Sequence, residues 1–469
     1  EEVAEAVSAA CGHLFHLERD LPFHAELIEH DGDGDTGEVT LVLVMHHIAT
    51  DGWSMGPLTA DLSAAYAARR DGRAPSFTPL PVQYADFALW QREQAESERA
   101  GLEFWRSALA GMPEELALPV DRPRPAQPSY RGGQVRLPVD VGLAGGLREL
   151  ARAHNASPFM VAHAASAALL NVLGAGTDVP LGTVVSGRSD QALTDVVGFF
   201  VNSLVLRTDT SGNPTFGELL ERVRSADLAA FEHQDVPFDL LVEELQPARS
   251  LSRHPLFQVS LTWESAPEPL LELAGAHSTL AEAPFDVAKF DLEFGFAEEA
   301  GGGLALVVGY ARDLFDRVSA QEFGDRLLRL LGQVVADPET RLSALGVLSD
   351  AEVTEALVRG RGPVATPPAS LSSAASSTAP AAASASSVVG VLRERVAGCP
   401  EAVALEWDGG ELSYGELLAR AESVASGLLA SGVGREQVVP VLMERSADAV
   451  VALLGVLLAG GAYLPVHTA

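Results

Sequence analysis

The decisive stretch of the sequence is Met45-His46-His47-Ile48-Ala49-Thr50-Asp51-Gly52-Trp53-Ser54. It follows an apolar run, Val39 to Met45, that predicts a buried strand, and it precedes a segment, Pro57 to Arg69, that predicts a helix. Polar side chains at such a junction are held rigidly while they face a channel. Two imidazoles, a carboxylate and a glycine in this position are typical of an acyl-transfer site.

His47 is the candidate base, because a neutral imidazole near pH 7 accepts a proton from, or hydrogen-bonds, an attacking amine or alcohol. Asp51 is expected to pair with a distant arginine and so brace the turn. Gly52 permits close backbone approach and is placed to aim an N–H at a developing oxyanion. The competing interpretation is a core histidine pair followed by an ordinary Asp-Gly turn.

A metal site fits the His46–His47 pair poorly. Adjacent residues of a strand point to opposite faces. The two cysteines are far from the pair, and the sequence contains no HExxH or CxxC motif. We therefore expect no bound metal.

Composition favours an enzyme of more than one domain. A chain of 469 residues exceeds what one core usually supports, and its 47% hydrophobic content is ample for burial. The 64 acidic and 32 basic residues give a formal charge of -32, which argues against nucleic acid or an anionic membrane as a partner. Lys289 is the only lysine, so arginine supplies nearly all the positive charge.

Cysteine usage and the first residues indicate the compartment. Cys11 and Cys399 are too far apart in the chain to imply a disulfide framework, which favours a reducing compartment. The sequence has no signal peptide and no run of about 18 apolar residues. We expect a soluble cytoplasmic protein, and the absence of a starting methionine indicates a piece of a longer one.

Composition divides the chain into three parts. Residues 360–387 are rich in Ala, Ser and Pro and predict a disordered or extended linker. They separate a first α/β body, residues 1–359, from a second, residues 388–469. In the first body we expect strands at Val39–Met45, Val179–Val185, Leu204–Thr208, Val259–Thr262 and Leu304–Tyr310, and helices at Pro158–Leu173, Thr215–Phe231 and Val318–Ala336.

Five further stretches follow the histidine motif along the first body. They are Tyr84-Ala85-Asp86-Phe87-Ala88-Leu89-Trp90, Gly182-Thr183-Val184-Val185-Ser186-Gly187-Arg188, Val197-Gly198-Phe199-Phe200-Val201-Asn202-Ser203, His233-Gln234-Asp235-Val236-Pro237-Phe238-Asp239 and Ser252-Arg253-His254-Pro255-Leu256-Phe257-Gln258-Val259. In this order they resemble the motifs of the condensation domain of nonribosomal peptide synthetases. The first body is therefore identified as a member of that family.

The resemblance implies two chloramphenicol-acetyltransferase-like lobes, an incomplete first lobe at about residues 1–130 and a second at about residues 131–359. Phosphopantetheine arms of an upstream and a downstream carrier protein would enter a tunnel between the lobes from opposite sides. The upstream arm carries an aminoacyl or peptidyl thioester, and the α-amine of an aminoacyl group on the downstream arm attacks it. The implied product is a peptide bond, with no covalent enzyme intermediate and no cofactor bound by the domain itself.

The resemblance also implies roles for residues of the histidine motif. His47 would deprotonate the amine or position it. His46 would fix the turn, Asp51 would support it, and Gly52 would admit the substrate. Trp53 and Ser54 complete the motif as supporting residues.

Residues of the later motifs receive roles in the same way. Arg188 is the expected partner of Asp51, because a buried carboxylate needs a cation. Asn202 is expected near the channel, with a structural and a functional role equally open. Around Tyr84 to Trp90 we expect packing, with both end aromatics buried and Asp86 capping a helix. His233 and His254 are expected to hold loops by hydrogen bonds.

Subtypes and alternatives remain. Heterocyclising relatives carry aspartates in place of the histidines, and epimerising relatives differ around Gly198 to Asn202, so the chain resembles a condensing member. The stereochemistry of the donor stays open. One alternative is an acyltransferase that uses coenzyme A thioesters. Another is a noncatalytic recruitment module, in which His46 and His47 would usually be lost.

The second body resembles the opening of an adenylation domain. The matching stretches are Leu412-Ser413-Tyr414-Gly415-Glu416-Leu417 and Leu457-Leu458-Ala459-Gly460-Gly461-Ala462-Tyr463-Leu464-Pro465-Val466. We expect a helix at Ser413–Ala430, a strand at Val438–Met443 and a helix at Ala447–Leu458. ATP and Mg are implied only for a complete domain, because the phosphate loop and late lysine of the family would lie beyond Ala469.

Overall fold

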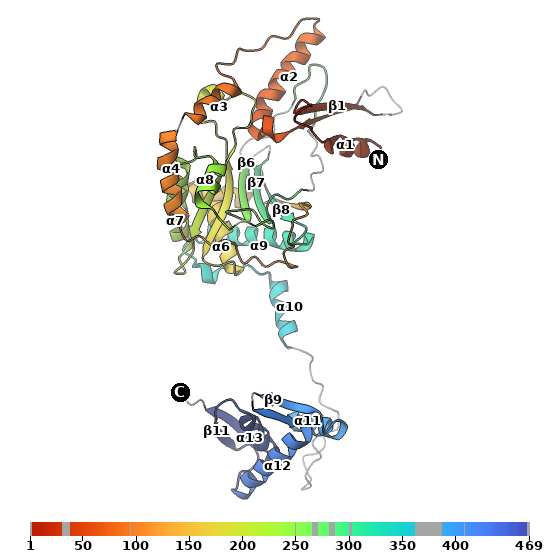
Figure 1. Cartoon of the computed structure of the whole chain (residues 1–469), viewed down its shortest axis with the longest axis vertical. Helices are drawn as coiled ribbons and strands as arrows, with labels where there is room; N and C mark the ends of the chain where they lie inside the picture. Colours follow the sequence, from red (N-terminus) through yellow and green to blue (C-terminus); the bar gives the residue numbers. More distant parts are fainter. Residues whose placement is uncertain are drawn as a thin grey trace. The chain divides into compact units, whose positions relative to one another are not determined.

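The computed structural model describes residues 2–30, 38–93, 95–248, 250–264, 271–280, 287–299, 303–361, 387–407 and 409–466 (Figure 1). The chain forms two compact units, Glu1–Ala351 and Glu352–Ala469. Most of the linker that the sequence predicts, residues 362–386, lies outside the described residues.

Unit 1 is built on a six-stranded mixed sheet. Two of its strand pairs are parallel, β4 with β6 and β6 with β7, and the other three are antiparallel. Of the central strands, β4 and β8 read as nearly continuous apolar runs, whereas β6 and β7 alternate between apolar and polar or small residues. The strand order is β3 (Gly132–Val139), β8 (Leu304–Ala311), β7 (Leu292–Glu298), β6 (Val259–Glu264), β4 (Asp178–Val185) and β5 (Asn202–Asp209).

Helices pack against this sheet and close its main core. α6 (Pro158–Val172) begins at Ser157, whose side chain accepts the Met160 N–H. Every residue from Met160 to Leu170 is buried, so α6 is a core helix that is covered on all sides. The other helices of this layer are α5 (Val141–Ala153), α7 (Phe216–Glu232) and α9 (Arg317–Ala336).

The first part of unit 1 forms a small two-stranded sheet that packs against a helix. An antiparallel pair, β1 (Phe23–Glu29) and β2 (Val39–Met45), contacts α1 (Glu2–Cys11). Two short 3-10 turns follow β2 and lead into a long helix. The remaining elements are η1 (His47–Ala49), η2 (Gly52–Ser54), α2 (Met55–Arg70), α3 (Tyr84–Arg92), α4 (Ala95–Ala108), η3 (Gln191–Leu193), α8 (Phe238–Leu245), η4 (Leu342–Ala344) and α10 (Asp350–Arg361).

Each strand and helix expected in unit 1 is present, with ends that differ by at most two residues. The prediction that Val39–Met45 is a buried strand is wrong, because only Val42 of β2 is buried and Val39 and Leu41 are exposed. The sequence reasoning missed β1, β3 and β7. Gly295 interrupts the apolar pattern of β7, and Gly132 and Gly133 open β3. The prediction that Trp90 is buried is wrong, because it is 47% exposed and Phe87 is the buried aromatic of α3. Asp86 does cap α3, since its carboxylate accepts the Gln83 N–H.

The described residues of unit 2 form two two-stranded sheets, the helices α11, α12 and α13, and most of α10, which begins two residues before the unit. β11 and β12 pair in parallel, as in a βαβ unit, and α13 connects them. Ser413 and Glu416 form a capping box that starts α12. Its elements are α11 (Val388–Gly398), β9 (Val403–Trp407), β10 (Gly410–Ser413), α12 (Tyr414–Ala430), β11 (Val438–Leu442), α13 (Ala447–Leu458) and β12 (Ala462–Val466).

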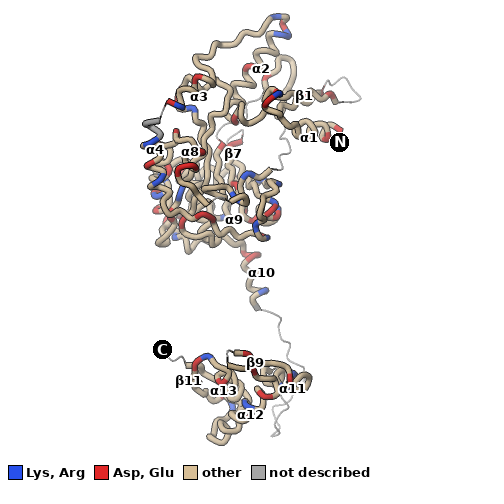
Figure 2. The backbone as a smooth tube through the Cα atoms, in the orientation of Figure 1, with Lys and Arg blue, Asp and Glu red and all other residues tan. Residues whose placement is uncertain are grey.

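Charge is spread over both units. Figure 2 shows Lys and Arg scattered among Asp and Glu along the tube. No helix in the described part of the chain is both long enough and apolar enough to cross a membrane.

A buried polar triad joins α6, α7 and β5. His163 Nδ1 lies 2.9 Å from Asp227 Oδ1, and its Nε2 lies 2.9 Å from Thr208 Oγ1. The side chains of His163 and Asp227 are 0% exposed. Because a carboxylate only accepts hydrogen bonds, His163 Nδ1 carries the proton. The imidazole and the carboxylate therefore each have a hydrogen-bond partner in the core.

Replacement of Asp227 by Ala should lower the free energy of unfolding by about 3–5 kcal/mol, because it leaves a buried imidazole without its partner. Urea unfolding followed by tryptophan fluorescence measures this. Asp71→Ala is the control, since that carboxylate is 62% exposed. A loss below about 1 kcal/mol for Asp227→Ala would show that the pair contributes little.

Candidate active site

The histidine motif lies at the end of β2, where the chain leaves the hairpin for α2. The backbone N–H of His46 donates to the Pro22 carbonyl at 3.0 Å. Its ring Nδ1 accepts the Ile48 N–H at 3.1 Å and caps η1. Nδ1 is therefore unprotonated in the neutral ring, and His46 stabilises the local turn.

His47 is held in one tautomer. Its Nδ1 lies 2.7 Å from the Thr50 carbonyl oxygen. A carbonyl only accepts, so Nδ1 carries the proton and the neutral ring leaves a lone pair on Nε2. His47 is exposed, and its ring meets that of Phe199 edge-on, at a centroid distance of 5.0 Å and an interplanar angle of 89°. The residue thus presents an accessible basic nitrogen.

Asp51 points the other way, into the protein, and its side chain is 1% exposed. Its carboxylate accepts from Arg188 Nη1 at 2.8 Å, from the Phe200 N–H at 3.0 Å and from the Ser54 N–H at 2.9 Å. Burial raises the pKa of the Asp51 carboxyl, but the hydrogen bonds from Arg188, Phe200 and Ser54 outweigh burial and hold the pKa below its usual range.

Arg188 is the cation that the sequence analysis assigned to Asp51, and the structure contains this ion pair. Its side chain is 6% exposed, and Nη2 donates to the Val196 carbonyl at 3.1 Å. The guanidinium carbon lies 4.3 Å above the Phe200 ring, a cation–π contact. Gly187 has φ +64°, and a Cβ there would lie 1.9 Å from the Phe200 carbonyl oxygen, so only glycine fits beside this pair.

Ser54 connects the motif to residues 196–200, hereafter the crossover segment. Ser54 Oγ is buried and lies 2.8 Å from Asp51 Oδ1 and 2.9 Å from the Gly198 carbonyl oxygen. It also accepts from the Gly198 N–H at 3.1 Å and from Arg188 Nη2 at 2.9 Å. Sequence reasoning placed Ser54 among the supporting residues but did not predict this hub, because Arg188 and Gly198 lie more than 130 positions away in the chain.

Tyr84 completes the anchorage of the crossover segment. Its hydroxyl donates to the Phe199 carbonyl at 2.8 Å. A Cβ on Gly198 would lie 2.3 Å from the Tyr84 ring, which accounts for glycine at that position. The backbone of residues 198–200 is therefore fixed from three directions by residues that precede it by more than 100 positions.

Asn202 bonds through its side-chain amide to the loop between α7 and α8. Its Nδ2 donates to the carbonyls of Gln234 and Val236 at 2.8 and 2.7 Å, and its Oδ1 accepts the Phe238 N–H at 3.0 Å. These bonds use its amide fully and join β5 to the loop between α7 and α8.

Gly52 and Trp53 lie at the start of η2 without such bonds to the crossover segment. Trp53 is 47% exposed. A Cβ built on Gly52 would meet nothing within 4 Å, and its φ is not positive. Within the described residues, therefore, packing and backbone conformation do not explain the glycine.

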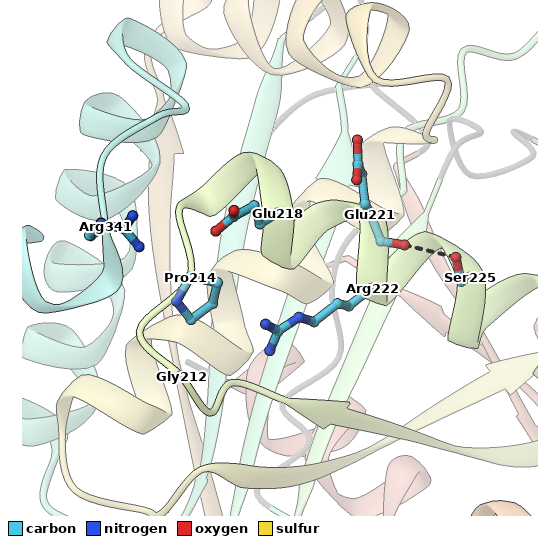
Figure 3. Close-up of a pocket in the computed structure, with 7 residues that line it drawn as sticks. All are labelled: Gly212, Pro214, Glu218, Glu221, Arg222, Ser225 and Arg341. Carbon is cyan, nitrogen blue, oxygen red and sulfur yellow. Dashed lines mark hydrogen bonds between the residues drawn. The ribbon is translucent and has the colours of Figure 1, made fainter.

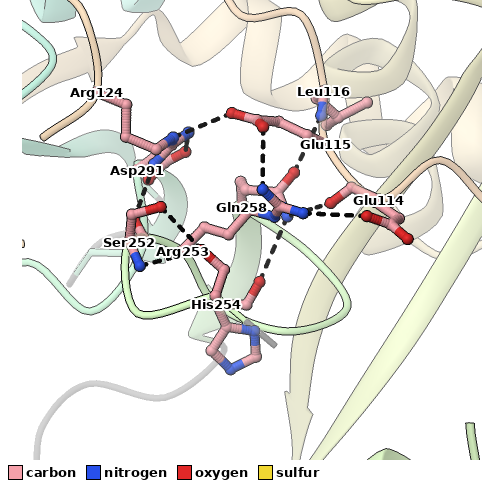
Figure 4. A network of polar contacts seen from close by, with 10 residues as sticks. Glu114, Glu115, Leu116, Arg124, Ser252, Arg253, His254, Gln258 and Asp291 are labelled. Atoms are coloured by element: carbon pink, nitrogen blue, oxygen red, sulfur yellow. Dashed lines mark hydrogen bonds and ion pairs between the residues drawn. The ribbon is translucent and has the colours of Figure 1, made fainter. Parts of the chain in front are cut away.

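The two loop histidines differ. His233 holds its loop as expected, because its Nδ1 lies 2.9 Å from the Ala229 carbonyl and its ring stacks on Phe104. The His254 Nδ1 is buried without a hydrogen-bond partner among the described residues, so its ring is held by packing, and burial lowers its pKa to about 4. Figure 4 shows the ionic network beside it, in which Arg253 pairs with Glu114 and Glu115 at 3.2 Å each and Arg124 pairs with Asp291 at 2.5 Å.

A surface hollow lies elsewhere, at the start of α7 (Figure 3). It measures about 670 Å³, and its two arginines, Arg222 and Arg341, already donate to backbone carbonyls. No motif histidine lines it. Among the described residues, no three His, Cys, Asp or Glu side chains gather where they could hold a metal ion.

The comparisons with known proteins identify the family. The family model of the condensation domain matches residues 1–357, and that of AMP-binding enzymes matches residues 392–469. The chain therefore belongs to the condensation domain family of nonribosomal peptide synthetases, followed by the start of an AMP-binding region. The predicted fold class is confirmed, because unit 1 has the mixed α/β, chloramphenicol-acetyltransferase-like architecture of this family.

Relatives match nearly the whole chain but are far longer. CymA of Salinispora arenicola, a probable and atypical nonribosomal peptide synthetase, is 44% identical over 99% of this chain and 6% of its own length. A dimodular nonribosomal peptide synthase of Bacillus subtilis is 42% identical over 99% of this chain and 19% of its own length. The chain thus spans less than a fifth of either relative.

Among solved structures, the X-domain from teicoplanin biosynthesis is similar, with a TM-score of 0.69 and 37% identity over 74% of this chain and 79% of that one. The same domain has been solved in complex with OxyB.

The Asp51 carboxyl should make stability depend on pH. Its folded pKa is depressed, so its contribution is present above the unfolded value of about 3.9 and is lost as the pH falls through the folded pKa. Asp51→Asn should be less stable than wild type by about 3–5 kcal/mol at neutral pH, because Arg188 stays buried without its anion.

Urea unfolding of wild type and Asp51→Asn between pH 2 and pH 8 measures the difference between their free energies of unfolding. It should be constant above about pH 5 and shrink below about pH 4. A difference that does not change with pH would show that the ion pair is not its source.

Proposed function

We propose that this chain forms peptide bonds in nonribosomal peptide synthesis. The donor is an aminoacyl or peptidyl thioester on an upstream carrier, and the acceptor is the α-amine of an aminoacyl group on a downstream carrier. The observation that carries this proposal is His47, whose Nδ1–H is fixed on the Thr50 carbonyl and whose Nε2 has no hydrogen-bond partner among the described residues. Membership of the condensation domain family supports it.

The reaction needs one proton to move and no covalent enzyme intermediate. The nitrogen of the acceptor amine attacks the thioester carbonyl carbon. During the attack, His47 Nε2 accepts a hydrogen bond from the N–H of that amine and takes up its proton. As the tetrahedral intermediate collapses, the C–S bond breaks, the C–N bond remains, and the proton passes to the departing thiolate sulfur. Gly52 belongs to the same motif, and its missing side chain would leave room for the substrate.

The partners and the compartment belong to the same proposal. Phosphopantetheine on the two carriers is the only cofactor involved, and the condensation domain itself binds none. ATP and Mg would serve a complete adenylation domain, whereas residues 388–469 hold no lysine and should not adenylate. The net charge of -32 supports cytoplasmic work without nucleic acid or membrane.

A recruitment module is the second candidate. The likeness to the X-domain from teicoplanin biosynthesis, which forms a complex with OxyB, favours it. In that case His46 and His47 would be dispensable, whereas the first proposal requires His47. A free-standing acyltransferase that uses coenzyme A thioesters has the same histidine but no need of the adjoining AMP-binding region.

His47→Ala should abolish transfer and leave the fold intact. The protein, an aminoacyl donor carrier and a loaded acceptor carrier are mixed, and the dipeptidyl carrier is followed by intact-protein mass spectrometry. We expect a fall of about 100-fold or more, because the base is lost, with an unchanged melting temperature, because His47 is exposed. Loading without transfer in either protein would favour recruitment, whereas equal transfer by both proteins would remove His47 from the role of base.

Gly52→Ala should separate substrate approach from folding. The added methyl group meets no protein atom within 4 Å, so the melting temperature should not change. Transfer should fall by about 10-fold or more, because the methyl group displaces the substrate. Gly56→Ala is the matched control, since its Cβ also meets nothing within 4 Å. Normal transfer by Gly52→Ala would remove this glycine from the site.

A further inference from the structure

Phe199 differs from its neighbours in the crossover segment. Gly198 and Phe200 are buried, whereas Phe199 is 38% exposed. Isolated exposed aromatic residues are common and need no explanation by themselves. What sets Phe199 apart is that its ring contacts His47 while its backbone is held in place by several bonds.

The backbone at Phe199 is fixed on both sides and at the residue itself. Ser54 bonds both the N–H and the carbonyl of Gly198, and the N–H of Phe200 bonds Asp51. The carbonyl of Phe199 accepts the Tyr84 hydroxyl at 2.8 Å. With the backbone fixed in this way, the direction of the Phe199 side chain is set before any substrate arrives.

The side chain meets His47 edge-on, at 5.0 Å between ring centroids. The hydrogen bond from Nδ1 to Thr50 fixes one atom of the imidazole, but the terminal torsion of histidine is broad, so the ring is free to rock about that bond. A second contact away from Nδ1 limits this motion. Phe199 provides such a contact and leaves Nε2 without a hydrogen-bond partner among the described residues.

We propose that Phe199 is a positioning residue for His47: it holds the imidazole plane so that Nε2 stays aligned with the acceptor amine. The inference rests on the proposed function for its effect on turnover, but the alignment itself is a property of the free chain. A misalignment of about 1 Å in a catalytic group costs up to 100-fold in rate. Phe199 should therefore affect turnover more than substrate binding.

The test compares Phe199→Ala with Phe199→Leu, which keeps most of the bulk. Phe77→Ala is the control, because Phe77 is 50% exposed and lies in the segment that follows α2. We expect Phe199→Ala to lower kcat by about 10-fold and to change KM by less than about 2-fold. Phe199→Leu should recover most of the rate, and Phe77→Ala should match wild type.

A second readout needs no turnover. In protein labelled with ¹⁵N at histidine, with His47 assigned by comparison with His47→Ala, the wild-type signals should report a single Nδ1–H tautomer. In Phe199→Ala the Thr50 bond should keep this tautomer, while relaxation of the His47 ring signals should show an imidazole that moves more widely than in wild type. Because this measurement uses the free chain, it decides the role of Phe199 even if no substrate pair supports condensation.

The outcomes separate cleanly. A lower kcat together with altered His47 signals supports the proposal. A double variant that carries both His47→Ala and Phe199→Ala should be no slower than His47→Ala alone, which also supports it. Unchanged His47 signals in Phe199→Ala overturn the proposal. This holds if turnover is retained, and it also holds if turnover and the melting temperature both fall. In the latter case Phe199 only packs.

Discussion

The structure around the site depends on one buried ion pair, Asp51 with Arg188. Both side chains are nearly inaccessible, at 1% and 6% exposure. A lone charge at either position would be strongly destabilising, so each requires the other. The pair joins the turn after β2 to the end of β4, two segments that are 137 residues apart in the chain. Its net contribution to stability is modest by physical expectation, and its larger effect is to fix the geometry around it.

That geometry explains residues that otherwise look unrelated. Gly187 and Gly198 are glycines because Phe200 and Tyr84 approach them closely, and Ser54 is a small hydroxyl because four partners converge on it. Together they fix the crossover segment against the histidine motif. His47 is exposed and its Nε2 has no hydrogen-bond partner among the described residues, and a Cβ on Gly52 would meet none of their atoms within 4 Å. Rigid support on one side and accessibility on the other is the arrangement that preorganised catalysis requires.

Much of this was predictable from sequence, for identifiable reasons. Strands such as Val39–Met45 and the core helix at Pro158 follow from apolar runs bounded by caps, which are local signals. Arg188 as the partner of Asp51 came from the resemblance to condensation domains, since spacing alone does not select one arginine among many. The Ser54 hub, the Phe199 contact and the use of Asn202 could not be predicted, because each depends on segments that only the fold brings together. Exposure was misjudged at Trp90, where an aromatic residue on a short helix faces outward.

The most direct test is a double-mutant cycle on the ion pair, with stability and dipeptide formation measured on Asp51→Asn, Arg188→Met and the double variant. Each single variant leaves one buried polar partner unpaired, whereas the double variant removes both charges. If the pair acts by positioning the crossover segment and His47, the double variant should regain stability to within about 1–2 kcal/mol of wild type and still fail to form dipeptide at the wild-type rate. Recovery of both properties in the double variant would contradict the account, because it would show that the site needs no ion pair to align it.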